Sequence, residues 1–147
     1  MEIEIMNSSH IDNVLEMSKV FYASDALDHA VPMDIIEENI KIAVSGNDIL
    51  TGYVMCEDNK PVGFSYVTCY YETEVGGVCA QILDLYIDSA YRGRGYASKY
   101  FQYIFDRYNY AKRFRLEVVR DNENAINVYK KMGFKDIAYG QMAIDKI

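Results

Sequence analysis

The chain has 147 residues, of which half are hydrophobic and 14% are aromatic. This length predicts one folded domain over residues 1–147, and the apolar content is unlike that of a disordered protein. Its formal net charge of −7 argues against nucleic acid as the main partner. No apolar run approaches the roughly 18 residues that span a bilayer, and the acidic, alternating N-terminus is unlike a signal peptide, so we expect no membrane segment and a cytoplasmic location.

The N-terminal third predicts one strand and two helices. Residues 2–6 alternate polar and apolar side chains, as a half-buried strand does. A pair of serines then offers an N-cap for a helix over residues 11–22, where apolar side chains recur at helical spacing. A second helix is expected after Pro32, with Gly46 as its terminator.

The middle of the chain predicts three antiparallel strands. Residues 49–56, 62–71 and 78–87 are rich in β-branched and aromatic residues. Turn-forming sequences at residues 57–61 and 76–77 separate them. Consecutive strands joined by such short turns indicate a meander.

Three cysteines lie in these expected strands, at positions 56, 69 and 79. An odd number without CxxC spacing argues against a disulfide framework or a zinc site. We therefore expect no metal and interpret the cysteines as small buried hydrophobic residues. A reactive thiol is the alternative.

The last third of the chain alternates helices and strands. A glycine-rich segment at residues 92–95 opens a helix, and a strand is expected over residues 114–119. A further helix, capped at residues 121–122, ends at Gly133, and residues 134–147 are expected to supply one or two final strands. The order of elements predicts an α+β domain around a mixed sheet.

Charge is distributed unevenly along the chain. Residues 1–90 carry a formal charge of −13, and residues 91–147 carry +6. An acidic part joined to a basic part suggests a site that handles a cation on one side and an anion on the other. Ordinary solvated surfaces are the alternative.

The most informative segment is the strand-to-helix junction at residues 92–98. Gly93 and Gly95 lack a Cβ atom, so the backbone can bend sharply there and approach a ligand closely. The first amides of the helix have no intrahelical partner, and the helix dipole adds about half a positive charge. Such a junction can bind pyrophosphate, and Arg92 and Arg94 add charged donors. A tight connection without a ligand is the alternative. Two rival phosphate-binding motifs do not match, because the P-loop pattern is absent and the third glycine of a dinucleotide fingerprint is missing.

Two motifs resemble the signatures of the GNAT acetyltransferases. The segment Arg92-Gly93-Arg94-Gly95-Tyr96-Ala97 resembles the family's R/Q-x-x-G-x-G/A signature, and residues 122–134 resemble N-x-x-A-x-x-x-Y-x-x-x-G-F. The two stand in the family's order, and the resemblance covers most of residues 50–140. It implies a three-layer α/β/α fold with a mixed, largely antiparallel sheet of six or seven strands. In the family this sheet is splayed between two strands and flanked by about four helices.

The resemblance also implies that acetyl-CoA is the cosubstrate. In the family, the strand before the glycine-rich turn pairs with the pantetheine arm through its backbone, and the turn binds the pyrophosphate. In the second motif, an asparagine contacts the cofactor arm. The alternative role for this asparagine is that of a helix N-cap only. The residues expected to bind the cofactor are Leu85, Tyr86, Ile87, Arg92, Gly93, Arg94, Gly95, Tyr96, Ala97, Ser98, Asn122, Tyr129 and Lys131.

The family generally reacts by direct attack of an amine on the thioester in a ternary complex, which implies no catalytic cysteine. Tyr129 matches the tyrosine beside the thioester sulfur and is the candidate general acid. Glu117 and Asp84 are the candidates for the base that removes the proton of the amine, and for both a surface or sheet-paired carboxylate is the alternative. Strand alternation leaves open which face of the sheet Asp84 occupies.

The acceptor is expected to be a small-molecule amine, and the acidic N-terminal part fits a cationic amine or a polyamine. A short stretch, residues 122–130, is similar to diamine acetyltransferases. Tyr22, Asp28 and Glu72 are the candidate substrate-binding residues. A protein N-terminus or lysine, an amino acid and an aminoglycoside remain alternatives.

Two readings from other functional classes also remain open. One is a non-catalytic acyl-CoA-binding or regulatory module, and the other is a nucleotide-binding domain that uses the glycine-rich turn alone. Dimerisation is common in the family, and the tyrosine-rich strands are a candidate homodimer interface.

Overall fold

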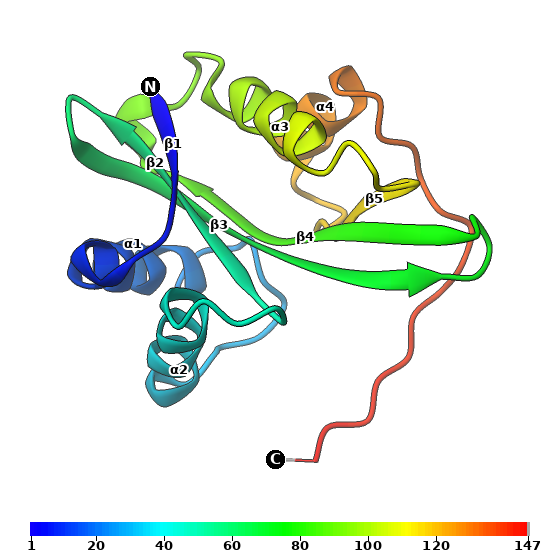
Figure 1. Cartoon of the computed structure of the whole chain (residues 1–147), viewed down its shortest axis with the longest axis horizontal. Helices are drawn as coiled ribbons and strands as arrows, with labels where there is room; N and C mark the ends of the chain where they lie inside the picture. The colour runs from blue at the N-terminus through cyan, green and yellow to red at the C-terminus, as the bar shows by residue number, and fades with distance from the viewer. Residues whose placement is uncertain (147) are drawn as a thin grey trace.

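The computed structural model describes residues 1–146, which form a five-stranded sheet with helices on both faces (Figure 1). The sheet order follows the chain order, with antiparallel neighbours throughout except the parallel pair β4–β5. The strands are β1 (Glu2–Ile5), β2 (Thr51–Glu57), β3 (Lys60–Glu72), β4 (Gly77–Ile87) and β5 (Arg113–Leu116).

Four α-helices lie in two layers, one on each face of the sheet (Figure 1). One face carries α1 (Ile11–Tyr22) and α2 (Met33–Val44), and the other carries α3 (Tyr96–Arg107) and α4 (Glu123–Lys131). Short 3₁₀ helices at Ser8–His10 and Ser89–Tyr91 precede α1 and follow β4. The three-layer mixed fold predicted from the sequence is therefore confirmed. No helix within residues 1–146 has the length and apolar content needed to cross a membrane.

Two hydrophobic clusters, separated by the sheet, hold the layers together. Apolar faces of α1 and α2 pack on Phe64 and Tyr66 on one side, while α3 packs on Tyr53 and Met55 on the other. Helical spacing of the apolar residues accounts for both contacts. Two of the buried tyrosines, Tyr53 and Tyr108, hydrogen-bond each other through their hydroxyls at 2.7 Å, as buried polar groups require.

The C-terminal segment differs from the prediction. Residues 134–146 form no strand, and residue 147 lies outside the described residues. The sheet thus has five strands over residues 1–146 instead of six or seven. From Lys135 to Lys146 the backbone makes no hydrogen bond to the rest of the described chain. The segment therefore does not become part of the sheet, although β5 is an edge strand whose outer side is unpaired.

Candidate functional site

Strands β4 and β5 pair over only part of their length. Their parallel register begins at Cys79 opposite Arg113 and ends at Ile82 opposite Leu116. On its other side, β4 stays paired with β3 as far as Ile87. The backbone of β4 beyond Ile82 therefore has an edge without a neighbouring strand, and an extended ligand can pair with it as an added strand would. This is the splay that the resemblance to the GNAT family implied.

A β-bulge lies where the two strands separate. Tyr66 of β3 is opposite Asp84, but the next residue, Val67, is opposite Ile82. Leu83 is therefore an extra residue in β4 without a partner in β3. Such bulges bend a strand and redirect its side chains, and they are frequent beside active sites.

The bulge decides the orientation of Asp84. Ile82 and Leu85 both belong to the cluster under α3, although they are three residues apart. Tyr86 belongs to the cluster under α1 and α2, and the Asp84 carboxylate hydrogen-bonds Tyr22 at the end of α1. Simple alternation counted from Ile82 would have placed Asp84 on the opposite face.

Hydroxyl groups surround Asp84. Tyr22 donates to its carboxylate, and the Ser65 hydroxyl donates to its backbone carbonyl at 2.5 Å. The hydroxyl of Tyr66, directly opposite in the register, is buried without a hydrogen-bond partner among the described residues. Burial raises the pKa of Asp84, and the Tyr22 hydrogen bond partly offsets that rise. A half-buried carboxylate with a raised pKa suits the acceptance of a proton.

Tyr22 stays protonated and so remains a hydrogen-bond donor to Asp84. Its own burial and the adjacent Asp84 carboxylate raise the pKa of Tyr22. Ionisation of both groups is unfavourable because two negative charges would lie in direct contact. The pair therefore has a fixed arrangement, with the phenol donating and the carboxylate accepting.

The glycine-rich turn after β4 is shaped as the sequence predicted. Gly93 and Gly95 have φ angles of +74° and +77°, in the left-handed region that favours glycine. A Cβ atom added to either residue would meet no atom within 4 Å. No side chain caps the first amides of α3. Their partial positive charge and the open space beside both glycines fit the pyrophosphate of coenzyme A.

Two arginines flank this turn, and both are exposed. Nε of Arg92 donates to the carbonyl of Ile87 at 2.8 Å, and its guanidinium lies 5.8 Å from the ring centre of Tyr86. The guanidinium of Arg94 lies 5.2 Å from the ring centre of Tyr91. These contacts orient both groups while leaving N–H donors for an anion.

The second motif forms the start and the inner face of α4. Asn122 accepts a hydrogen bond from the amide of Ala125 at 3.2 Å, so it is an N-cap, and its contact with a cofactor remains a prediction. Tyr129 is half-buried, with its ring edge-on to Phe101 at 5.6 Å. Burial raises the pKa of Tyr129, and its hydroxyl has no hydrogen-bond partner within the described residues. Lys131 is exposed at the end of the helix.

Among the remaining predicted residues, Glu72 is the one that the register places far from Asp84. Glu72 lies six residues further along β3 than Tyr66, the partner of Asp84, which corresponds to roughly 20 Å. Its carboxylate pairs with Arg113 at 2.6 Å. Asp28 is exposed in the α1–α2 connection. Glu117 is exposed directly after β5.

Sequence reasoning missed the bulge and two neighbours of Asp84, Ser65 and Tyr66. A signal for the bulge was present, because two adjacent apolar residues, Ile82 and Leu83, interrupt the alternation just before Asp84. The buried serine on β3 had no comparable signal, since a small polar residue inside a strand does not reveal its hydrogen-bond partner.

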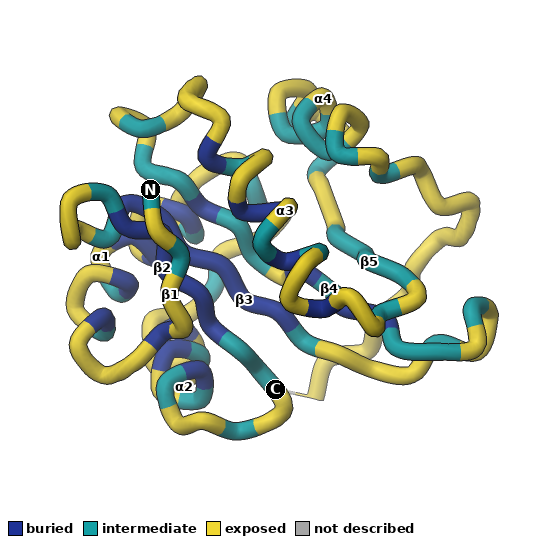
Figure 2. The backbone as a smooth tube through the Cα atoms, turned by 45° about the horizontal axis from the view of Figure 1, so that its top comes forward, coloured by how far each residue is buried: buried dark blue, intermediate teal, exposed yellow. Residues whose placement is uncertain are grey.

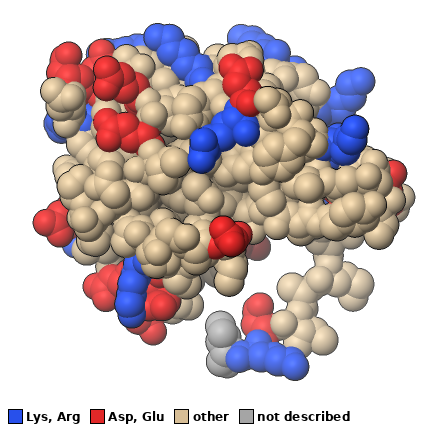
Figure 3. Space-filling view, viewed as in Figure 1, with Lys and Arg blue, Asp and Glu red and all other residues tan. Residues whose placement is uncertain are grey.

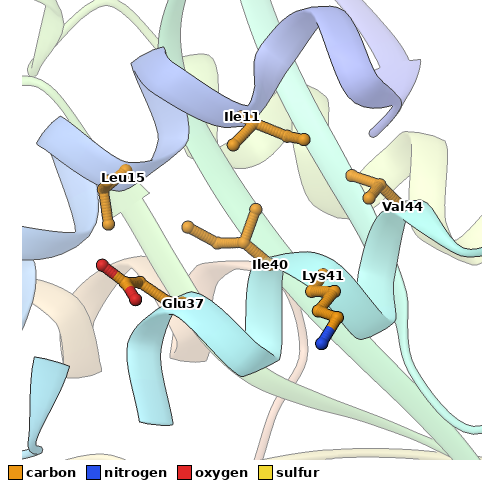
Figure 4. A pocket seen from close by; sticks show the side chains of 6 residues that line it. All are labelled: Ile11, Leu15, Glu37, Ile40, Lys41 and Val44. Atoms are coloured by element: carbon orange, nitrogen blue, oxygen red, sulfur yellow. The ribbon is translucent and has the colours of Figure 1, made fainter. Parts of the chain in front are cut away.

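Two pockets lie away from this region. Figure 4 shows a small apolar groove of about 120 Å³ between α1 and α2, lined by Ile11, Leu15, Glu37, Ile40, Lys41 and Val44. A polar pocket of about 440 Å³ is lined by Asn47, Asp48, Thr51, Val67, Cys69, Arg107, Tyr108 and Tyr110. Neither includes Asp84 or the glycine-rich turn. Among residues 1–146, no group of three His, Cys, Asp or Glu side chains is placed to hold a metal ion.

The sequence matches the family model described as "Acetyltransferase (GNAT) family" over residues 13–134. Both predicted motifs lie within that match. A search among curated proteins finds no match.

Solved structures with the same fold cover nearly the whole chain. A possible acetyltransferase from Clostridium difficile 630 superposes with a TM-score of 0.82 at 19% identity, over 99% of this chain and 97% of its own. The aminoglycoside N-acetyltransferase AAC(6')-Iy in complex with CoA gives 0.79 at 14% identity, over 99% and 95%. A ribosomal-protein-alanine N-acetyltransferase from Brucella melitensis biovar Abortus 2308 gives 0.76 at 15% identity, over 99% of both chains.

Proposed function

The chain belongs to the GNAT family of acetyltransferases, and from this premise we propose that it moves an acetyl group from acetyl-CoA to a primary amine by direct attack in a ternary complex. One observation carries the proposal: the free edge of β4 leads from Asp84, through the short 3₁₀ helix Ser89–Tyr91, to the glycine- and arginine-rich turn before α3. A proton acceptor and an anion cradle are thus joined by a single stretch of backbone.

In this proposal acetyl-CoA lies along the free edge of β4. The backbone of Leu85, Tyr86 and Ile87 pairs with the pantetheine arm, and residues 92–98 receive the pyrophosphate. Arg92 and Arg94 add charge to the cradle, while Asn122 and Lys131 contact the cofactor from α4. The thioester supplies an activated acetyl group, and every proton transfer falls to side chains of this chain or to water.

Asp84 is the proposed general base. A primary amine has a pKa near 10.4, so it arrives as a cation and must lose a proton before it can attack. The Asp84 carboxylate takes that proton, directly or through one water, and the neutral nitrogen then bonds to the thioester carbon. The raised pKa of Asp84 brings its proton affinity closer to that of the amine. Glu117, whose carboxylate is exposed directly after β5, remains the second candidate.

Tyr129 is the proposed general acid. As the carbon–sulfur bond breaks, the departing sulfur gains charge and needs a proton. Reference pKa values near 10 for tyrosine and 8.5 for a thiol make complete transfer uphill by about 2 kcal/mol, and burial of Tyr129 adds to that cost. We therefore propose that its hydroxyl donates a hydrogen bond to the sulfur during bond cleavage.

The proposed acceptor is a small cationic amine. Tyr22 and Asp84 offer an aromatic wall beside a carboxylate, and Asp28 lies in the adjoining α1–α2 connection. Glu72 contributes less than the sequence suggested, because Arg113 already neutralises it. The structural neighbours carry names with different acceptors, an aminoglycoside and a ribosomal protein, so the fold alone does not select between small molecules and proteins.

The experiment is a coenzyme A release assay with acetyl-CoA and a panel of polyamines, aminoglycosides, amino acids and peptides. We expect free thiol to appear only when an amine acceptor is present, with a small cationic amine as the best substrate. Binding of acetyl-CoA without turnover of any amine would instead identify a non-catalytic acyl-CoA-binding module. Thermal stabilisation by ATP or NAD, but not by coenzyme A, would identify a nucleotide-binding domain.

A further inference from the structure

The first turn of α3 has one buried side chain, that of Tyr96. The turn before it is exposed and contains two glycines with positive φ, Gly93 and Gly95, and no side chain among residues 1–146 caps the helix. The next buried residue of the helix, Tyr100, lies one helical turn further along. Figure 2 shows the exposed turn in yellow and the buried start of the helix in dark blue. The position of this first turn therefore depends on what Tyr96 contacts.

The hydroxyl of Tyr96 reaches across to the β2–β3 hairpin. It donates to the carboxylate of Glu57, the last residue of β2, at 2.5 Å, although 39 residues separate the two in the sequence. This hydrogen bond lowers the pKa of Glu57 and raises the pKa of Tyr96, so at neutral pH a phenol donates to an ionised carboxylate. Hydrogen bonds to charged acceptors are stronger than those between neutral groups.

Aromatic and cationic contacts extend this hydrogen bond into the glycine-rich turn. The ring of Tyr96 stacks on that of Tyr91, with ring centres 6.2 Å apart. The guanidinium of Arg94 lies 5.2 Å from the ring centre of Tyr91, and Nζ of Lys99 lies 5.8 Å from that of Tyr96. Since Tyr91 precedes the turn and Tyr96 follows it, these contacts join the two ends of the turn, and Glu57 joins them to the hairpin.

We propose that Glu57 is a positioning residue for the cofactor, which acts through Tyr96 to hold the first turn of α3 so that its free amides are aligned before acetyl-CoA binds. This inference rests on the proposed function, because these are the amides assigned to the pyrophosphate. A backbone that contains two left-handed glycines loses much conformational freedom when a ligand orders it. A hydrogen bond that already orders the turn in the free protein lowers that cost of binding.

The sign of the effect distinguishes positioning from simple electrostatics. A carboxylate beside an anion site repels the anion, so on charge alone the removal of Glu57 should tighten the binding of acetyl-CoA. Positioning predicts the opposite, a loss of affinity. The charge of Glu57 is also partly compensated, because the amino nitrogen of Met1 lies 3.1 Å from the oxygen that accepts from Tyr96.

The first test is calorimetric titration of the intact protein with acetyl-CoA. Tyr96→Phe removes one hydroxyl and should raise the Kd for acetyl-CoA about tenfold, while kcat at saturating acetyl-CoA stays the same. Tyr108→Phe is the matched control, because Tyr108 is a buried tyrosine at the other end of α3 whose hydroxyl bonds that of Tyr53 at 2.7 Å. Its affinity should match wild type, and equal losses in the two variants would overturn the inference.

The second test is a double-mutant cycle between Glu57 and Tyr96. Glu57→Ala should also weaken acetyl-CoA binding, and by more than Tyr96→Phe, because it removes the contact with Met1 as well. Adding Tyr96→Phe to Glu57→Ala should weaken binding no further, since the two residues act through one hydrogen bond. Tighter binding by Glu57→Ala, or losses that simply add, would contradict the positioning role.

The third test needs no cofactor. The amide of Lys99 donates to the carbonyl of Gly95 at 3.1 Å, at the start of α3. In the free protein, Tyr96→Phe should speed hydrogen exchange at this amide about tenfold, whereas Tyr108→Phe should leave it unchanged. Unchanged exchange in Tyr96→Phe would overturn this inference alone. A wild type that binds no acetyl-CoA would instead overturn the proposed function, and the cofactor role of Glu57 with it.

Discussion

At the scale of single residues, Asp84 combines two opposing demands. Its carboxylate must be ionised to accept a proton, but burial raises its pKa and so disfavours the ionised form. The Tyr22 hydrogen bond moderates this conflict without removing it. Such a residue is expected to contribute to catalysis and to lower the stability of the fold.

The variant Asp84→Asn tests both effects. We expect kcat/KM at neutral pH to fall by about 10² to 10⁴-fold, with a smaller defect at alkaline pH, where the free amine is more abundant. A carboxyl whose folded pKa exceeds its unfolded value destabilises the protein at pH values above the folded pKa. The variant should therefore melt at a higher temperature than wild type at neutral pH, and the difference should shrink as the pH falls through the raised pKa. Asp136→Asn, at an exposed position with no proposed role in the site, is the control and should change neither quantity appreciably. Unchanged turnover in Asp84→Asn would reassign the base.

Tyr22 is proposed as a positioning residue that acts through Asp84. Tyr22→Phe keeps the ring, which packs edge-on against Phe21 at 5.0 Å, and removes only the hydroxyl. Because the lost hydrogen bond had lowered the pKa of Asp84, the acid limb of the kcat/KM profile should move to higher pH. A purely structural role for Tyr22 would lower activity without moving that limb.

Tyr129→Phe tests the assignment of the general acid. The substitution preserves packing against Phe101 and Phe134, so folding should be unaffected. We expect kcat to fall on the order of 10²-fold, with little change in the affinity for acetyl-CoA measured by calorimetry. Wild-type turnover in this variant would remove Tyr129 from the mechanism.

At the scale of elements, the turn between β4 and α3 offers a matched comparison of strain and binding. Gly93 and Gly46 share a φ of +74°, and at both an added Cβ meets nothing within 4 Å. Gly93→Ala and Gly46→Ala should therefore each lose about 1–2 kcal/mol of unfolding free energy. Only Gly93→Ala should also weaken acetyl-CoA binding, because its methyl group enters the space proposed for the pyrophosphate. Equal acetyl-CoA affinity in the two variants would argue against the cradle.

Features determined by residues close together in the sequence were predictable. Features determined by contacts with residues far away in the sequence were not. The left-handed glycines before α3 belong to the short connection between a strand and a helix, and the sequence shows this pattern plainly. The orientation of Asp84 depends on the pairing of β3 with β4 at the bulge, which the period of one strand cannot reveal. The predicted final strands failed for the same reason: residues 134–146 have an apolar pattern but pair with no strand of the described chain.

At the scale of the whole molecule, the uneven charge of the sequence is only partly separated in space. Figure 3 shows basic side chains along the top and right, where α3 and α4 lie, acidic ones at the upper left, and a mixed group at the lower left, over α1 and α2. β4 runs between these layers, with Asp84 facing α1 and the glycine-rich turn leading into α3. A cationic acceptor and an anionic cosubstrate would thus approach from opposite sides and meet at the free edge of β4.

The most direct measurement is amide hydrogen exchange, resolved by residue with NMR, in the absence and presence of acetyl-CoA. Acetyl-CoA should slow exchange at those amides of β4 residues 83–87 that face the free edge instead of β3, and at the first amides of α3, residues 96–98, because these would become hydrogen-bonded to it. The account would be contradicted if acetyl-CoA binds while these amides exchange as before, or if protection appears only around the polar pocket of Asn47 and Arg107.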